Sequence, residues 1–199
     1  MIGVICCQVL EKEMRLALRQ AGVVHKFHVL EWGLHINPEQ LRQEVEKNIY
    51  TLQEEVDCIV LGFGRCQMRD ALPKDLKVPI DYPEGEDCIG VLLGQERYRQ
   101  ELQQEAGTWF LTPGWAELGL DFVFRELQLS NFAHKGIGPL DMARRMLEGY
   151  TRVLLIDSGV SQAQNLHSQG LAVANALGLP LRQTSGTLKS INAAINRAV

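Results

Sequence analysis

The sequence predicts an α/β protein with a mainly parallel sheet, or sheets, and helices on both faces. Three observations lead to this prediction. Short apolar runs alternate along the chain with longer segments of helical periodicity. The apolar runs contain few polar residues, as expected for parallel strands buried on both faces. Small or polar residues follow most of these runs, where strands give way to helices.

The expected elements follow one another in a regular order. Local signals place several helix ends, since Gly22 suits a helix C-terminus, Asn37 an N-cap and Pro38 the first helical turn. The expected strands are 2–7, 24–30, 56–61, 78–80, 108–111, 152–156 and 179–183. The expected helices are 8–20, 38–53, 88–93, 96–104, 119–130, 140–147, 162–177 and one after residue 187.

The two halves of the chain have similar patterns, each with about three strand-turn-helix units. We therefore expect two Rossmann-like lobes around a cleft, with an N-terminal lobe at 1–105 and a C-terminal lobe at 106–199. One continuous doubly wound sheet is the alternative.

Composition restricts the classes of partner. Among 199 residues the net charge is -4, and no basic run is present, which argues against nucleic acid as a partner. The apolar runs are shorter than the roughly 20 residues that cross a membrane. The segment 1–7 lacks a basic leader and a cleavage site, so a first strand is favoured over a signal peptide. We expect a cytoplasmic protein, for which the helix 39–53 offers a surface for a homodimer.

The five cysteines all lie in the first half, and disulfides are rare in the cytoplasm. Cys58 lies inside a strand and is expected to pack there. Cys6 or Cys7 ends the first strand, while Cys66 and Cys88 follow the third and fourth. If those strands are parallel, three thiols meet at one sheet edge. Three thiolates suit Zn²⁺ or a [4Fe-4S] cluster with one coordination position open. The spacing matches no compact metal motif, and three buried cysteines near turns are the alternative.

Other residues at strand ends are weaker candidates. Ser185 and Gly186 precede the last helix, where an anion could bind or an ordinary cap could form. Trp115 could line a cofactor pocket or belong to the core. Asp157 could bind a polar ligand or cap its own turn. His35 could be a ligand, carry a proton or simply form a hydrogen bond.

Two further features are expected to have ordinary structural roles. The glycines of Gly62-Phe63-Gly64 lack the remaining residues of a phosphate-binding loop, so a tight turn is favoured. Glu13, on the first helix, is expected on an exposed face.

Several strings resemble one family. They are Cys7 to Glu13, Leu34-His35 with Pro38, Ile59 to Cys66, Asp87-Cys88-Ile89 and Gly107 to Trp115. On these strings the chain resembles the family known only as domain of unknown function 1638, found mostly in anaerobic archaea and bacteria. The resemblance covers nearly the whole chain.

The resemblance implies a ligand set and a setting. It selects Cys7 over Cys6, together with Cys66 and Cys88, as the characteristic cysteines. It also implies association with corrinoid-dependent methyltransferase systems for methylamines and similar compounds. The chain departs from the family pattern at Glu86, where a histidine is usual, and at Phe63, where a tyrosine is usual.

Together these features predict a metal or iron–sulfur protein that acts on a small substrate at the open coordination position. Glu86 and His35 are the expected catalytic residues, with Glu86 as a proton carrier if burial raises its pKa. The expected partners are a small molecule and a corrinoid protein or methyltransferase. The alternative is a non-catalytic carrier of a metal, corrinoid or small ligand.

Overall fold

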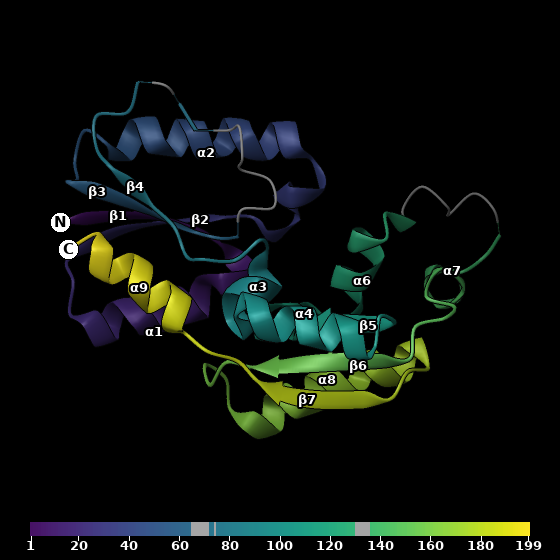
Figure 1. The fold of residues 1–199 in the computed structure, drawn as a ribbon. Helices are drawn as coiled ribbons and strands as arrows, with labels where there is room; N and C mark the ends of the chain where they lie inside the picture. Colours follow the sequence, from purple (N-terminus) through teal and green to yellow (C-terminus); the bar gives the residue numbers. More distant parts are fainter. Residues whose placement is uncertain (65–71, 74, 130–135) are drawn as a thin grey trace. The chain divides into compact units, whose positions relative to one another are not determined.

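The computed structural model describes residues 1–64, 72–73, 75–129 and 136–199 (Figure 1). The chain forms two compact units. Unit 1 consists of Met1–Gln95 together with Thr187–Val199, and unit 2 of Glu96–Gly186. Each unit contains one parallel sheet with helices packed on it, which confirms the predicted fold class. None of the helices in the described ranges combines the length and the apolar character needed to cross a membrane.

The sheet of unit 1 has the strand order β2-β1-β3-β4, and every pairing is parallel. The strands are β1 (Ile2–Cys7), β2 (His25–Leu30), β3 (Cys58–Gly62) and β4 (Ile80–Asp81). The two central strands, β1 and β3, are almost entirely buried. Their register pairs Cys6 with Gly62, so both strands end at the same edge of the sheet.

Helices cover both faces of this sheet (Figure 1). Helix α2 (Pro38–Leu52) lies on one face, and α1 (Glu11–Ala21) and α9 (Lys189–Arg197) lie on the other. Three further short helices lie in the described part of this unit: η1 (Gln8–Leu10), η2 (Trp32–Ile36) and α3 (Cys88–Leu93). The apolar stripe of α2 explains its packing, because its buried residues recur at helical spacing. They are Leu41, Val45, Ile49 and Leu52, and they contact a core that includes Ile5 and Ile59.

The sheet of unit 2 has the order β5-β6-β7, again parallel throughout. Its strands are β5 (Thr108–Leu111), β6 (Arg152–Asp157) and β7 (Leu181–Ser185). Its helices are α4 (Gln95–Gln104), α5 (Pro113–Leu118), α6 (Leu120–Glu126), α7 (Pro139–Met146) and α8 (Ala163–Leu177). Helix α8 packs so closely on β6 that a Cβ at Gly170 would lie 2.8 Å from the Leu155 side chain.

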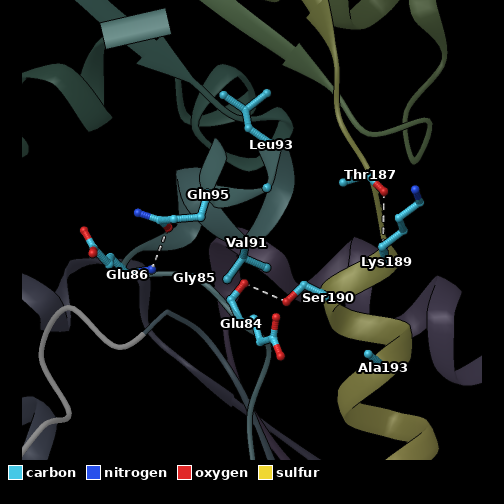
Figure 2. A pocket seen from close by; sticks show the side chains of 11 residues that line it. Glu84, Gly85, Glu86, Val91, Leu93, Gln95, Thr187, Lys189, Ser190 and Ala193 are labelled. Carbon is cyan, nitrogen blue, oxygen red and sulfur yellow. Dashed lines mark hydrogen bonds between the residues drawn. The ribbon is translucent and has the colours of Figure 1, made fainter. Parts of the chain in front are cut away.

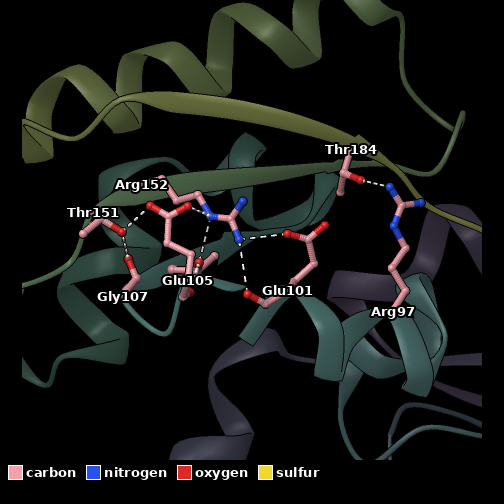
Figure 3. Close-up of polar contacts among 8 residues, drawn as sticks. Arg97, Glu101, Glu105, Gly107, Thr151, Arg152 and Thr184 are labelled. Carbon is pink, nitrogen blue, oxygen red and sulfur yellow. Dashed lines mark hydrogen bonds and ion pairs between the residues drawn. The ribbon is translucent and has the colours of Figure 1, made fainter. Parts of the chain in front are cut away.

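A half-buried ion-pair network joins α4 to the sheet of unit 2 (Figure 3). The Arg152 guanidinium lies 2.8 Å from a Glu101 carboxylate oxygen and 3.1 Å from one of Glu105. Arg152 also donates to the Thr108 hydroxyl at 2.8 Å. One turn earlier on α4, Arg97 donates to the Thr184 hydroxyl and, at 3.0 Å, to the Ser185 carbonyl. These contacts hold α4 along β5, β6 and β7.

Candidate functional site at the end of strands β1 and β3

The strand order of unit 1 creates a topological switch point between β1 and β3. The chain passes from β1 to β2 on one side and later returns to place β3 on the other. In open α/β sheets, ligands bind outside the carboxyl ends of the strands at such a point. Cys6 and Cys7 end β1, and Gly62 ends β3. The switch point therefore lies where the sequence predicted the cysteines to gather.

Close packing at two glycines brings three segments together there. A Cβ at Gly62 would lie 2.7 Å from Cys6 Sγ and 2.9 Å from Met14 Cε. A Cβ at Gly64 would lie 2.4 Å from the Asp87 backbone. Only glycine fits at these distances, so the turn after β3 touches both β1 and the residue that precedes Cys88. The predicted tight turn that would bring Cys66 close to another segment continues beyond Gly64, outside the described residues.

Cys6 is the best defined thiol of this edge. Its side chain is fully buried and donates to the carbonyl oxygens of Cys7, at 3.2 Å, and of Gly62, at 3.4 Å. Burial is the main cause that raises the pKa of the Cys6 thiol well above its usual value. The other causes are the negative charges of nearby groups, namely Cys7, Cys88, Glu13 and Glu11. Cys7 and Cys88 therefore both lie within electrostatic range of Cys6, and both are half-buried.

Glu13 is the residue that the sequence analysis missed. An exposed position was expected, and this was wrong, because Glu13 is fully buried on α1. The buried residues of that helix are Glu13, Met14, Ala17 and Leu18, which occupy one face at positions i, i+1, i+4 and i+5. The helical spacing of Glu13 and Ala17 was a signal that could have placed this carboxyl on the inner face.

Cys88 opens α3 as predicted. Asp87 is the N-cap, and its Oδ1 accepts a 2.7 Å hydrogen bond from the Gly90 N–H. Glu86, one residue earlier, has an exposed side chain, while its N–H donates to Gln95 Oε1 at 3.4 Å. The proton-carrier prediction for Glu86 depended on burial, which the structure does not provide.

His35 lies in η2, and its Nδ1 is 2.7 Å from the Trp32 carbonyl oxygen. A carbonyl only accepts, so Nδ1 carries the proton and Nε2 is the basic nitrogen of the neutral ring. His35 is thus held in one tautomer, as a base or a metal ligand requires.

The other predicted residues belong to unit 2. Asp157 Oδ1 accepts from the Gly159 N–H at 2.9 Å, so this side chain caps its own turn. The Gly186 N–H donates to the Asp157 carbonyl at 2.7 Å, and Ser185 is the last residue of β7. Trp115 stacks on Phe122, with ring centroids 4.6 Å apart.

The predicted anion site at Ser185 and Gly186 requires N–H groups that already have partners. Beyond the Gly186 bond, the Thr187 N–H donates to the Leu92 carbonyl at 2.7 Å. An anion at this turn would therefore have to displace a backbone bond.

Within the described ranges, no group of three or more histidine, cysteine, aspartate and glutamate side chains has the arrangement of a metal site. Cys66 lies outside those ranges. The three-cysteine site therefore stays a prediction, with Cys7 and Cys88 near one edge of the sheet in unit 1.

A family model described as protein of unknown function (DUF1638) matches residues 29–195. The chain belongs to the DUF1638 family. This confirms the resemblance drawn from the sequence strings. The range matched in this DUF1638 protein contains Cys66 and Cys88 and begins after Cys7 and Glu13. Searches of the curated proteins and of the solved structures returned no match.

Proposed function

We propose that this DUF1638 protein binds Zn²⁺ or a [4Fe-4S] cluster through Cys7, Cys66 and Cys88, with one coordination position left for a small substrate. The observation that carries the proposal is the close packing of the turn after β3, which contacts Cys6 at Gly62 and the Asp87 backbone at Gly64, beside Cys7 and Cys88 at the switch point of unit 1. The sequence places Cys66 two residues after Gly64, which packs against Asp87.

The chemistry of these groups supports a bound cation. Thiols and a buried carboxyl of like charge repel one another when they ionise, and this repulsion contributes to the raised pKa of Cys6. A metal ion offsets such repulsion and favours the thiolate form of its ligands. The donor set therefore fits Zn²⁺ or an iron–sulfur cluster better than it fits a hard, oxygen-preferring cation.

Chain residues would supply the remaining functions. A bound metal would provide an electrophilic centre that polarises a substrate heteroatom. His35, protonated on Nδ1, presents Nε2 as a base, and Glu86 offers an exposed carboxylate beside Asp87 and Cys88. Methylated amines, sulfur compounds and corrinoid-linked groups are the substrate classes we propose, with a corrinoid protein or methyltransferase as partner.

A carrier without catalytic activity is the second candidate, and the exposure of Glu86 favours it, because an exposed carboxylate is a poor general acid. An enzyme that uses Glu86 would lose activity in Glu86→Gln, whereas a carrier would keep its binding function.

The decisive experiment is metal and acid-labile sulfide analysis, with an absorption spectrum, on protein purified without oxygen. Cys66→Ser is expected to lose the bound metal. Cys58→Ser is the matched control, since Cys58 is a buried thiol inside β3 and should leave the metal content unchanged. Cys6→Ala should also retain metal if Cys7 is the ligand.

Each outcome has a clear meaning. Iron and sulfide in cluster proportion would establish a cluster, and zinc without sulfide would establish a zinc thiolate site. Folded protein without either, or equal metal content in Cys66→Ser and Cys58→Ser, would refute the three-cysteine site.

A further inference from the structure

Unit 1 contains a pocket of about 750 Å³ that the cysteine site does not include (Figure 2). Its walls come from the loop before α3, from the end of α3, and from the start of α9. The residues whose charges bear on its function are Glu84, Glu86 and Lys189, and the apolar ones are Val91, Leu93 and Ala193.

The acidic wall is held in place by the protein's own contacts. The Glu84 carbonyl accepts a 2.7 Å hydrogen bond from the Ser190 hydroxyl of α9. A Cβ at Gly85 would lie 2.6 Å from the Val91 backbone nitrogen, so the loop is pressed against α3. The Glu86 N–H is bonded to the Gln95 side chain. Glu84 and Glu86 thus project from a loop that is fixed at three consecutive residues.

The opposite wall is positive. Lys189 is the first residue of α9 and projects from the other side of the pocket in Figure 2. The N-cap of this helix is Leu188, and the Lys189 N–H donates to the Thr187 hydroxyl at 3.2 Å, so the Lys189 ammonium is the positive group that this wall offers to a ligand. The two walls therefore carry opposite charges, with apolar side chains between them.

We propose that this pocket binds a small aliphatic zwitterion, a molecule with an ammonium group at one end and a carboxylate at the other. The ammonium group would lie against Glu84, the carboxylate against Lys189, and the methylene groups against Val91 and Ala193. Glu84 and Lys189 are exposed, so a singly charged ligand leaves the other charge in water and gains only one of the two charge contacts.

This inference goes beyond the proposed function, since all the residues that carry it lie outside the three cysteines. It holds whether or not a metal is bound. The two proposals can fail separately, because one is tested by metal content and the other by binding of an organic zwitterion.

The test is isothermal titration calorimetry on the full chain with three zwitterions of increasing charge separation: glycine, 4-aminobutanoate and 6-aminohexanoate. Butylammonium and butanoate are matched probes that each carry one of the two charges. We expect at least one zwitterion to bind the protein. Both single-charge probes should bind the protein at least about tenfold more weakly than that zwitterion, equivalent to the loss of one charge contact.

Substitutions test the contribution of each wall to binding. Lys189→Met and Glu84→Gln should each lower the affinity for the tightest-binding zwitterion by about tenfold. Lys47→Met, at an exposed position of α2, should leave that affinity unchanged. Thermal unfolding of each variant verifies that it is folded. Failure of all three zwitterions to bind, binding of butylammonium as tight as that of the best zwitterion, or unchanged affinity in folded Lys189→Met would each overturn the proposal.

Discussion

At the scale of single residues, two glycines determine how closely the segments of the cysteine site approach one another. Gly62 leaves room for the Cys6 thiol, and Gly64 leaves room for the Asp87 backbone. Neither has a positive φ angle, so space rather than backbone conformation requires glycine here. The two thiols differ in exposure, because the Cys6 side chain of β1 is buried against Gly62 of β3 whereas Cys7 is half-buried.

Gly62→Ala tests this packing. The added methyl group would meet Cys6 and Met14, both fully buried and unable to move into open space. We expect the free energy of unfolding to fall by about 1–3 kcal/mol, the usual cost of overpacking a core. Urea denaturation followed by circular dichroism measures the change.

Gly138→Ala is the control for that substitution. The nearest atom to its added Cβ lies 3.6 Å away, an ordinary contact, and its φ of -63° suits alanine. Gly138 is the N-cap of α7, where alanine is less favourable than glycine, so the free energy of unfolding should fall by no more than about 1 kcal/mol. Equal stability of Gly62→Ala and wild type would show that this edge of the sheet is looser than the structure indicates.

Sequence could predict some site residues and not others. The strand-end position of Cys7 and the Asp87-Cys88 helix start follow from local pattern, and both are found. The burial of Glu13 could not be inferred from residue type, because a glutamate is seldom buried. The partners of Asp157 and Gly186 also escape sequence reasoning, since their hydrogen bonds depend on which loops meet.

At the scale of helices and strands, the predicted ends are wrong where a turn or a proline interrupts an apolar run. The last strand was expected at 179–183 and lies at 181–185, because Gly178 and Leu179 close α8 through bonds to Asn175 and Ala174. The fourth strand begins at Ile80 rather than 78, since Pro79 has no N–H for the ladder. Helix α5 was not expected, although Thr112 and Pro113 form an ordinary helix start.

The attachment of α4 to β6 gives the second stability prediction. The Arg152 side chain is only 11% exposed and pairs with Glu101, which is 15% exposed. In Arg152→Met, Glu101 loses its cationic partner in a poorly hydrated place, whereas Glu105 is 38% exposed and keeps its hydrogen bond from the Thr151 hydroxyl. We expect a loss of about 3 kcal/mol in the free energy of unfolding, measured by urea denaturation.

Arg42→Met provides the comparison for an exposed pair. Arg42 is 42% exposed and pairs with Glu39 and Glu46 on the surface of α2. Its removal should cost less than about 1 kcal/mol, because water solvates these charges. If the two variants lose equal stability, the Arg152 network contributes no more than a surface ion pair.

At the scale of the whole molecule, the chain crosses from unit 1 to unit 2 and returns, so that α9 completes unit 1. Three of its residues, Ile191, Ala194 and Ile195, are fully buried there. The apolar spacing of residues 189–197 predicts a helix but not the sheet on which it packs, because every helix of an α/β protein has a similar stripe. The parallel sheets and the order of helices and strands could be predicted from the sequence. The return of the chain to unit 1 through α9 could not.

The end of α9 is attached to β4 by one ion pair, whose contribution to stability should depend on pH. Arg197 donates to both carboxylate oxygens of Asp81, at 2.8 and 2.7 Å. These hydrogen bonds lower the pKa of Asp81 below its usual value of 3.8. A carboxyl with a lowered pKa in the folded state stabilises that state above its unfolded pKa, and the contribution is lost as the pH falls through the lowered value.

Arg197→Met should therefore be less stable than wild type at pH 7 and pH 5, and the difference should shrink below about pH 4. Urea denaturation of both proteins between pH 7 and pH 3 measures this, with Asp81→Asn expected to show the same trend. A difference that stays constant down to pH 3 would mean that Arg197 stabilises α9 through packing and its 3.1 Å hydrogen bond to the Tyr82 carbonyl, and not through the Asp81 ion pair.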